Sequence, residues 1–200
     1  MKLTDRDVEI IRFINEFGFC EITQLTRKFD LKKPRCYQIM ERLVKANFVK
    51  HERIFYGKHG VFYLTNQGAS FSNLPPIKNI PKDNYDHQLA IINVYFKMMQ
   101  EFPNAEWLSE RFVRKQKSLY SVGKKIKHLC DGVLVLSDDK QIAIEVELTM
   151  KSKERLNEII RSYALHKHIK EVWYYCSPET LGRVQRAADK WEHVKVYGLE

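Results

Sequence analysis

Three prolines fall close together in the chain and limit what it can fold into. Pro75, Pro76 and Pro81 lie among mostly polar residues in the segment 73–83. Proline has no backbone N–H and a fixed φ, so neither a helix nor a central strand is expected to run through this segment. The sequence therefore predicts two modules, residues 1–72 and 84–200, joined by a proline-stiffened linker at 73–83.

Positive charge is concentrated before this segment. The chain has 34 Lys and Arg and 25 Asp and Glu, which gives a net charge of +9. Residues 1–82 contain 15 basic and 8 acidic residues, so +7 of the +9 lies there. A localised positive excess attracts polyanions such as nucleic acid. We therefore expect the first module to contact phosphate groups.

Cysteine spacing and hydropathy indicate the cellular compartment. Cys20, Cys36, Cys130 and Cys176 lie in apolar segments and lack the paired spacing of metal ligands, as expected of free buried thiols in a reducing environment. No apolar run approaches the roughly 18 residues of a membrane span, and the first residues lack the apolar stretch of a secretion signal. We expect a cytoplasmic protein that does not contact a membrane.

The first module has the pattern of three helices. Thr4 and Asp7 can cap a first helix, whose apolar positions recur on one face until Gly18 ends it. A second helix is predicted at 21–29. A third is predicted to begin near Pro34, because proline is favoured in the first turn of a helix.

A hairpin is predicted after the third helix. The segments 48–55 and 60–64 alternate or run apolar and aromatic, and residues 56–59 separate them as a basic turn. The run 61–68, Val-Phe-Tyr-Leu-Thr-Asn-Gln-Gly, resembles the wing exit of many bacterial winged-helix regulators. Three helices followed by a basic hairpin predict a winged helix-turn-helix that docks on duplex DNA.

The third helix and the hairpin supply the candidate DNA contacts. The alternative is that the helix is a solvated amphipathic helix and the hairpin a structural lid. For a helix in the major groove, we expect base-edge contacts from Arg35 and Gln38. For phosphate contacts we expect Lys32, Lys33, Arg53 and Lys58. Two further candidates on the exposed side of the helix are Arg42 and Lys45.

The second module alternates helix and strand patterns, which predicts a mixed α/β (α+β) fold with a mixed sheet. Pro103 ends its first helix. The expected order is α-β-β-β-α-β-α-β, with helices at 85–102, 153–166 and 177–190 and strands at 107–113, 129–136, 141–148, 171–176 and 193–197.

Three acids on neighbouring predicted strands are candidate metal ligands. Period two places Glu145 and Glu147 on one face of their strand, opposite a run of apolar residues. A symmetrical two-residue turn would set Asp131 opposite Val146, and a shift by one residue would set it opposite Glu145 or Glu147. Mg²⁺ prefers carboxylate oxygens and can activate water for phosphodiester cleavage. The alternative is a solvated sheet edge whose acids pair with nearby Lys or Arg.

The element order and these acids resemble the restriction-endonuclease-like PD-(D/E)XK fold. In that pattern an acid-x-Lys stands on the third strand, whereas this chain has Glu145-Val-Glu147. A displaced positive charge could come from Lys127, Lys151 or Lys153, and the sequence does not select among them.

Other side chains of this module have two interpretations each. His87, at the start of a helix, is a candidate to orient phosphate or a ligand, or a histidine bonded to backbone. Tyr163 is a candidate nucleophile, although core packing also explains its spacing. His166 and His168 are expected at a solvated helix end.

A further resemblance is carried by the segments 86–95, 130–136, 142–149, 151–163 and 172–175. It covers nearly the whole chain and is to the replication-relaxation family of plasmid and mobile-element proteins, to which mobilisation relaxases of the MobC class look related. The resemblance implies processing of DNA at an origin of transfer or replication.

Two hypotheses remain open. One is a sequence-specific duplex-DNA-binding accessory or regulator of a relaxase or replication initiator, with the second module used for a partner or for a homodimer. The other is an Mg²⁺- or Mn²⁺-dependent nicking enzyme that uses Asp131, Glu145 and Glu147 with Lys151 and His87.

Overall fold

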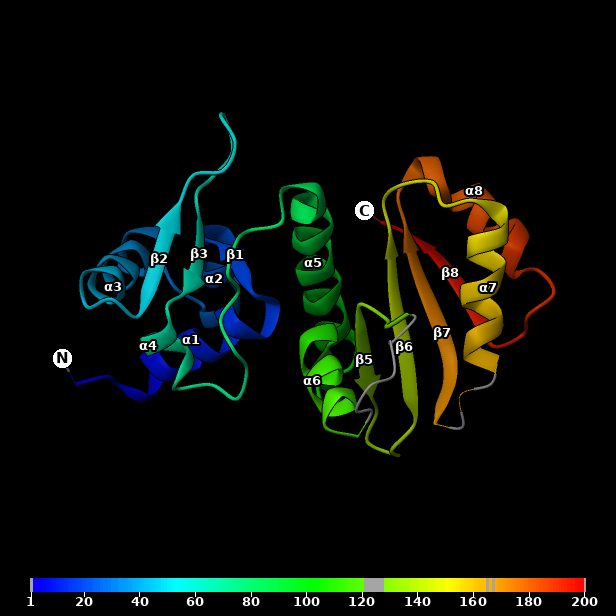
Figure 1. Ribbon diagram of the computed structural model, residues 1–200, viewed down its shortest axis with the longest axis horizontal. Helices are drawn as coiled ribbons and strands as arrows, with labels where there is room; N and C mark the ends of the chain where they lie inside the picture. Colours follow the sequence, from blue (N-terminus) through cyan, green and yellow to red (C-terminus); the bar gives the residue numbers. More distant parts are fainter. Residues whose placement is uncertain (1, 121–127, 165, 167, 200) are drawn as a thin grey trace. The chain divides into compact units, whose positions relative to one another are not determined.

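The computed structural model describes residues 2–120, 128–164, 166 and 168–199, and the chain separates into two units, Met1–Ile92 and Asn93–Glu200. Among these described residues, no helix has both the length and the apolar composition needed to cross a bilayer. The elements of Figure 1 are α1 (Asp5–Phe17), β1 (Phe19–Glu21), α2 (Ile22–Phe29), α3 (Lys33–Lys45), β2 (Val49–Glu52), β3 (Val61–Leu64), α4 (Asn66–Ala69), η1 (Lys82–Asn84), α5 (Tyr85–Glu101), β4 (Glu106–Ser109), α6 (Glu110–Tyr120), β5 (Gly132–Val135), β6 (Gln141–Glu147), α7 (Lys153–Ala164), β7 (Ile169–Cys176), α8 (Pro178–Ala188) and β8 (Val194–Gly198).

The first helix begins and ends where the sequence predicts. The backbone N–H of Thr4 donates to Asp7 Oδ2 at 2.9 Å, and the backbone N–H of Asp7 donates to Thr4 Oγ1 at 3.3 Å. This reciprocal pair satisfies two backbone donors that a helix start leaves unpaired. Gly18 ends α1 with a φ of 85°, a value that glycine adopts without steric cost.

The first unit has the order and pairing of a winged helix-turn-helix. Asp30 ends α2 in the left-handed region, and Pro34 lies in the first turn of α3, so the three predicted helices are confirmed. The predicted hairpin is also confirmed, as the antiparallel pair β2 and β3. A third strand, β1, pairs with β3 and gives the sheet order β1-β3-β2 (Figure 1).

The proline segment packs within the first unit. Leu74 and Ile80 are buried, and Asn15 Nδ2 donates to the backbone oxygen of Leu74 at 2.6 Å. Ile80 belongs to an apolar cluster with Phe19, Val61 and Tyr85. The border between the units therefore falls later than 73–83, inside α5 between Ile92 and Asn93.

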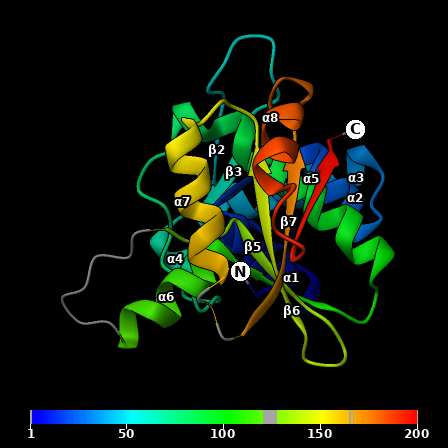
Figure 2. The ribbon, with the colours of Figure 1, turned by 90° about the vertical axis from the view of Figure 1, so that its right-hand side faces the viewer.

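The second unit is built on the predicted mixed sheet. Its strand order is β4-β5-β6-β7-β8, antiparallel from β4 to β6 and parallel from β6 to β8. Helices α7 and α8 cover one face (Figures 1 and 2). The C-terminal part of α5 packs on the other face, where Met98 accepts from the Tyr175 hydroxyl and Phe102 meets Trp173. The acids of β6 therefore lie on the covered face below α7 and α8.

The predicted strand 107–113 is confirmed only as far as Ser109, and its second half is wrong. Strand β4 ends at Ser109, whose Oγ accepts the backbone N–H of Phe112 at 3.1 Å at the start of α6. Glu110 and Arg114 then pair four residues apart along α6. The observed order of the unit is α-β-α-β-β-α-β-α-β, with α6 added to the predicted order.

The turn between β5 and β6 decides the register that the sequence left open. The backbone N–H of Leu136 donates to the Lys140 oxygen at 2.9 Å, and Asp139 has a φ of 61°, so the turn contains three residues. Gly132 lies opposite Ile144. The same register continued by one residue places Asp131 beside Glu145 rather than Val146.

Candidate functional sites

The solvent-facing side of α3 carries most of the predicted DNA-contacting residues. The exposed ones include Lys32, Lys33, Arg35, Gln38 and Lys45. The Arg35 guanidinium donates to Gln38 Oε1 at 3.3 Å, so the two candidate base-reading groups lie together. The buried side of the same helix packs through Cys36, Ile39, Met40 and Leu43. We call the exposed residues Lys33, Arg35, Tyr37 and Gln38 the α3 surface.

Tyr37 is a member of the α3 surface that the sequence analysis did not single out. Its side chain is 42% exposed although it is large and aromatic. The inward positions Cys36 and Ile39 already imply that residue 37 points outward, so helical spacing could have found it. An exposed aromatic beside a basic and an amide side chain is a suitable contact for a nucleic acid.

Arg42, another predicted DNA contact, is held by an intramolecular ion pair. Its Nη2 lies 2.5 Å from Oδ1 of Asp7, whose side chain is only 1% exposed. Asp7 also accepts the capping bonds from Thr4. Arg42 therefore joins α3 to the start of α1, and this role competes with any contact to DNA. Lys45 instead pairs on the surface with Glu41 at 2.7 Å.

The wing, residues 53–60, has one anchored and one exposed basic residue. Lys58 forms an ion pair with Asp86 and lies over the rings of Phe55 and Tyr85, at 5.3 and 5.0 Å from their centroids. Arg53 is exposed. Lys58 therefore fastens the wing to the start of α5, and Arg53 is the better candidate for a phosphate contact.

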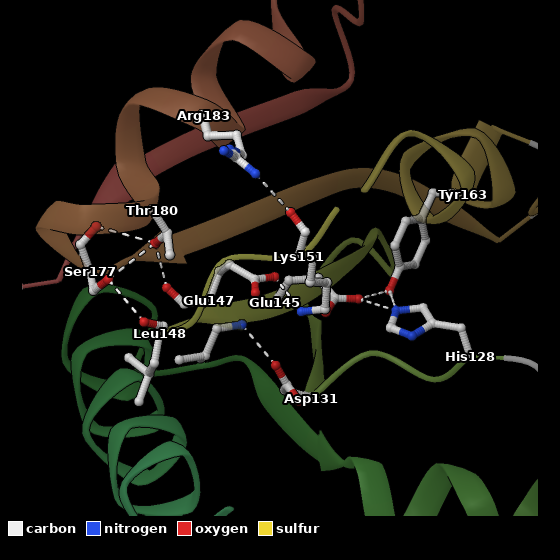
Figure 3. Close-up of polar contacts among 11 residues, drawn as sticks. His128, Asp131, Glu145, Glu147, Leu148, Lys151, Tyr163, Ser177, Thr180 and Arg183 are labelled. Atoms are coloured by element: carbon white, nitrogen blue, oxygen red, sulfur yellow. Dashed lines mark hydrogen bonds and ion pairs between the residues drawn. The ribbon is translucent and has the colours of Figure 1, made fainter. Parts of the chain in front are cut away.

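In the second unit, Glu145 is the centre of a buried polar network. His128 Nε2 lies 2.6 Å from Glu145 Oε1, and the Tyr163 hydroxyl donates to the same oxygen (Figure 3). Tyr163 and His128 also approach each other at 3.3 Å. Glu145 is only 3% exposed, which excludes the solvated sheet edge for this acid. The strand β6, the segment before β5 and helix α7 together place these three groups.

The electrostatics of the network follow from its burial. Burial raises the pKa of Glu145, and the hydrogen bond from His128 opposes that rise. Burial acts to lower the pKa of His128, but the hydrogen bond and charge of Glu145 outweigh it, so the pKa of His128 is raised. Burial, followed by the charge of Glu145, holds the pKa of Tyr163 far above its usual range. A phenol whose pKa is raised in this way stays protonated, which makes it a weak nucleophile.

The other two acids also have partners inside the unit. Asp131 Oδ2 accepts the backbone N–H of Val146 at 2.7 Å. Glu147 is buried and forms an ion pair with Lys151, four residues along the chain (Figure 3). Of the two described lysines that were considered as a displaced positive charge, Lys151 is therefore the one that meets an acid of β6. Lys153 is exposed at the start of α7, and Lys127 lies outside the described residues.

These side chains, as arranged, do not fit a divalent cation. Mg²⁺ requires several oxygen ligands in near-octahedral geometry. In the part of the chain that the structure describes, no group of three or more His, Cys, Asp or Glu side chains is placed to hold a metal ion. One Glu145 oxygen takes two hydrogen bonds, and Lys151 already neutralises Glu147. Asp131 and Glu145 do lie beside each other, as a shared site would require, but Glu147 does not complete it.

His87 lies in the first turn of α5 and belongs to the first unit, whereas the three acids belong to the second. Its side chain is partly buried. The role of His87 alongside the acids therefore stays a prediction.

His128, which the sequence analysis missed, also lines a cavity. The lining of this cavity of about 300 Å³ is mostly apolar, and its polar members include His128, Tyr163, His166 and His168. His166 and His168 are exposed, as expected for a solvated helix end. The sequence signal for His128 is weak, because a single histidine three residues before Asp131 has no period or spacing that marks it.

Comparisons with known proteins find no matching family model and no matching curated protein. Among solved structures, the chain is similar to the adhesin competence repressor (AdcR) of Streptococcus pyogenes, at 16% identity and a TM-score of 0.33, over 60% of this chain and 79% of that one. It is also similar to TrmBL2, an archaeal chromatin protein with a novel mode of DNA binding, at 11% identity and a TM-score of 0.28, over 98% and 73%. PigF with SAH follows at 8% identity and a TM-score of 0.22, over 99% and 67%. All three TM-scores are below 0.5, so the winged-helix assignment comes from the elements of the first unit.

Proposed function

We propose that this chain is a sequence-specific duplex-DNA-binding protein that docks through the α3 surface. The observation that carries the proposal is the side of α3 on which Lys33, Arg35, Tyr37 and Gln38 are exposed together. A helix with this face fits the major groove, where Arg and Gln read base edges. The +7 charge of residues 1–82 supplies the attraction to phosphates that is independent of sequence.

Selection from a random duplex library tests the proposal. The full chain should enrich a defined motif, and Arg35→Ala/Gln38→Ala should bind DNA with that preference relaxed, since each lost base contact costs about 1–3 kcal/mol of discrimination. Lys45→Ala is the matched comparison on the same helix, because the loss of a lysine that is not expected to read bases should weaken binding to all sequences and leave the preference unchanged. No enrichment by the wild type, or unchanged preference in the double variant, would contradict the proposal.

The biological setting is a further part of the proposal. The second unit has three antiparallel strands, with α6 between the first two, and then a helix and a parallel strand. Apart from α6, this order is compatible with the PD-(D/E)XK fold that the sequence resembles. Together with the resemblance of the sequence to the replication-relaxation family, this supports a role in mobilisation or replication of a plasmid or mobile element. The chain would then act at an origin, as an accessory or regulator of a relaxase or replication initiator.

Nicking by the second unit is the alternative function. Nicking is favoured by the position of Asp131 beside Glu145 and of Lys151 against Glu147, because these are residue types that such nucleases use. The absence of a metal-binding group among the described residues counts against it. We therefore propose the non-catalytic role for this unit.

A supercoiled plasmid carrying the cognate origin separates the two functions. Incubated with Mg²⁺ or Mn²⁺, the wild type should leave the plasmid supercoiled. Relaxation by the wild type that is lost in Glu147→Gln would overturn the non-catalytic role. Relaxation that persists in this variant indicates a contaminating nuclease.

A further inference from the structure

A basic groove between α7 and α8 is not used by the proposed function. This α7–α8 groove has a volume of about 490 Å³ and lies entirely in the second unit. Among the described residues that line it, Asp189 is the one acid. The basic and amide side chains of the lining are Lys153, Asn157, Arg183, Arg186 and Lys190.

The positive charges of the groove are not neutralised by the fold. Arg183 Nη1 donates to the backbone oxygen of Lys151 at 3.2 Å, which orients it without cancelling its charge (Figure 3). Within the described residues, no carboxylate forms an ion pair with Arg183, Arg186 or Lys190. These side chains therefore remain available for an anion.

Folding alone does not explain this arrangement. Arg183 and Arg186 are three residues apart on α8, so two like charges are neighbours on one side of this helix and repel. Lys190 follows just after the end of α8 and adds a third positive charge to the same groove. Lys153 is the first residue of α7, where the helix dipole disfavours a positive charge. Arg186 near the end of α8 is the one favourable position. A ligand that carries several negative charges would offset the repulsion.

We propose that the α7–α8 groove binds the phosphate backbone of duplex DNA, as a second contact in addition to the α3 surface. This inference rests on the proposed function. Arg183 and Arg186 are separated by roughly 4.5 Å of helical rise, and Lys190 follows two residues after the end of α8, so the three charges face about three phosphates of one strand. Arg, Lys and Asn side chains are common phosphate contacts that position a protein without reading sequence. Charges distributed over this length fit a polymer better than a single small anion.

The test measures how DNA affinity of the full chain depends on salt. Each phosphate contact contributes about 0.9 to the slope of log K against log salt concentration. The probe is a labelled duplex of about 60 base pairs, which is roughly six helical turns. With this probe, Arg186→Gln/Lys190→Gln should reduce the slope by about 1.8. The matched control is Arg161→Gln/Lys170→Gln, which removes the same charge from exposed positions that do not line the groove.

The outcomes separate this inference from the proposed function. A groove variant whose slope equals that of the control would overturn the groove contact. If Lys33→Gln/Arg35→Gln alone weakens binding, the α3 surface stands and the groove contact falls. No DNA binding by the wild type overturns both. Circular dichroism of each variant establishes that it is folded, as expected because the substituted groove residues are exposed.

Discussion

The α3 surface and the acid face of β6 both carry polar residues at regular spacing, but they meet different surroundings. Arg35 and Gln38 are exposed and contact mainly each other. Glu145 and Glu147 are buried, and each has a basic or hydroxyl partner from its own unit. The exposed side chains of α3 therefore remain available to a ligand, whereas the buried acids of β6 are already neutralised or hydrogen-bonded inside their own unit.

The comparison shows that a charged residue in a functional pattern is a candidate only until its partners are known. Arg42 makes the same point within the first unit, because it lies on the same helix as Arg35 yet pairs with buried Asp7. A buried carboxylate without partners is costly, so the fold supplies them and thereby removes the carboxylate from other roles.

The largest expected effect is on Glu145. Glu145→Ala leaves the Tyr163 hydroxyl and His128 without their buried acceptor, so we expect a loss of roughly 3 kcal/mol in the free energy of unfolding. Urea denaturation measures it. Glu145→Gln keeps an acceptor oxygen and should recover more than half of the loss. A Glu145→Ala protein as stable as the wild type would mean that this acid is free for another role, as the nicking hypothesis requires.

The next effect distinguishes the two basic residues of α3 that have ion pairs. Arg42→Ala leaves Asp7 buried with only its capping bonds, and we expect about 1–2 kcal/mol of destabilisation. Lys45→Ala removes an exposed i,i+4 pair worth roughly 0.3–0.5 kcal/mol. Thermal or urea unfolding of both variants tests this. Equal losses in the free energy of unfolding would mean that the Arg42–Asp7 pair contributes no more than an exposed surface pair.

A smaller effect separates Lys33 from Lys58 in DNA binding. Lys33 is exposed on α3, so Lys33→Ala should lower the salt slope of DNA binding by about 0.9. Lys58 is paired with Asp86 and packed on two rings, so Lys58→Ala should change the slope by less than about half of that. Fluorescence anisotropy at several salt concentrations measures both. A full loss of slope for Lys58→Ala would show that its ion pair opens on DNA.

The smallest effect is a pH dependence from His128. The folded pKa of His128 is raised, because Glu145 outweighs the opposing effect of burial. Its stabilising contribution is therefore complete below the unfolded value of about 6.5 and is lost as pH rises through the folded value. Urea midpoints should fall between pH 6 and pH 8.5 in the wild type and fall less in His128→Gln. Identical pH profiles would exclude this residue as the source.

Much of the fold could be predicted because its helices are strongly periodic. Thr4, Gly18 and Pro34 mark helix ends by local chemistry that needs no tertiary information. The missed elements are those with weak local signals. Strand β1 has three residues, and α6 follows β4 directly, so the apolar residues of 107–113 spread over both elements and look like one strand.

The candidate sites could be predicted in part. Helical spacing was sufficient to place Arg35 and Gln38 outward. The register that sets Asp131 beside Glu145 depends on a three-residue turn with Asp139 in the left-handed region, which the run Ser137-Asp-Asp-Lys140 does not specify. His128 had no periodic signal at all, since only its contact with Glu145 marks it.

The helix caps, the hairpin, the alternation of β6 and the concentration of positive charge in residues 1–82 all follow from local sequence. Which of the charges are neutralised depends on tertiary packing. Asp7 and Arg42 are 35 residues apart, and Glu145 and Tyr163 are 18 apart. Periodicity reports the face on which a side chain lies, because it depends on neighbours along the chain. The partner across that face depends on how distant elements pack, and local spacing does not encode it.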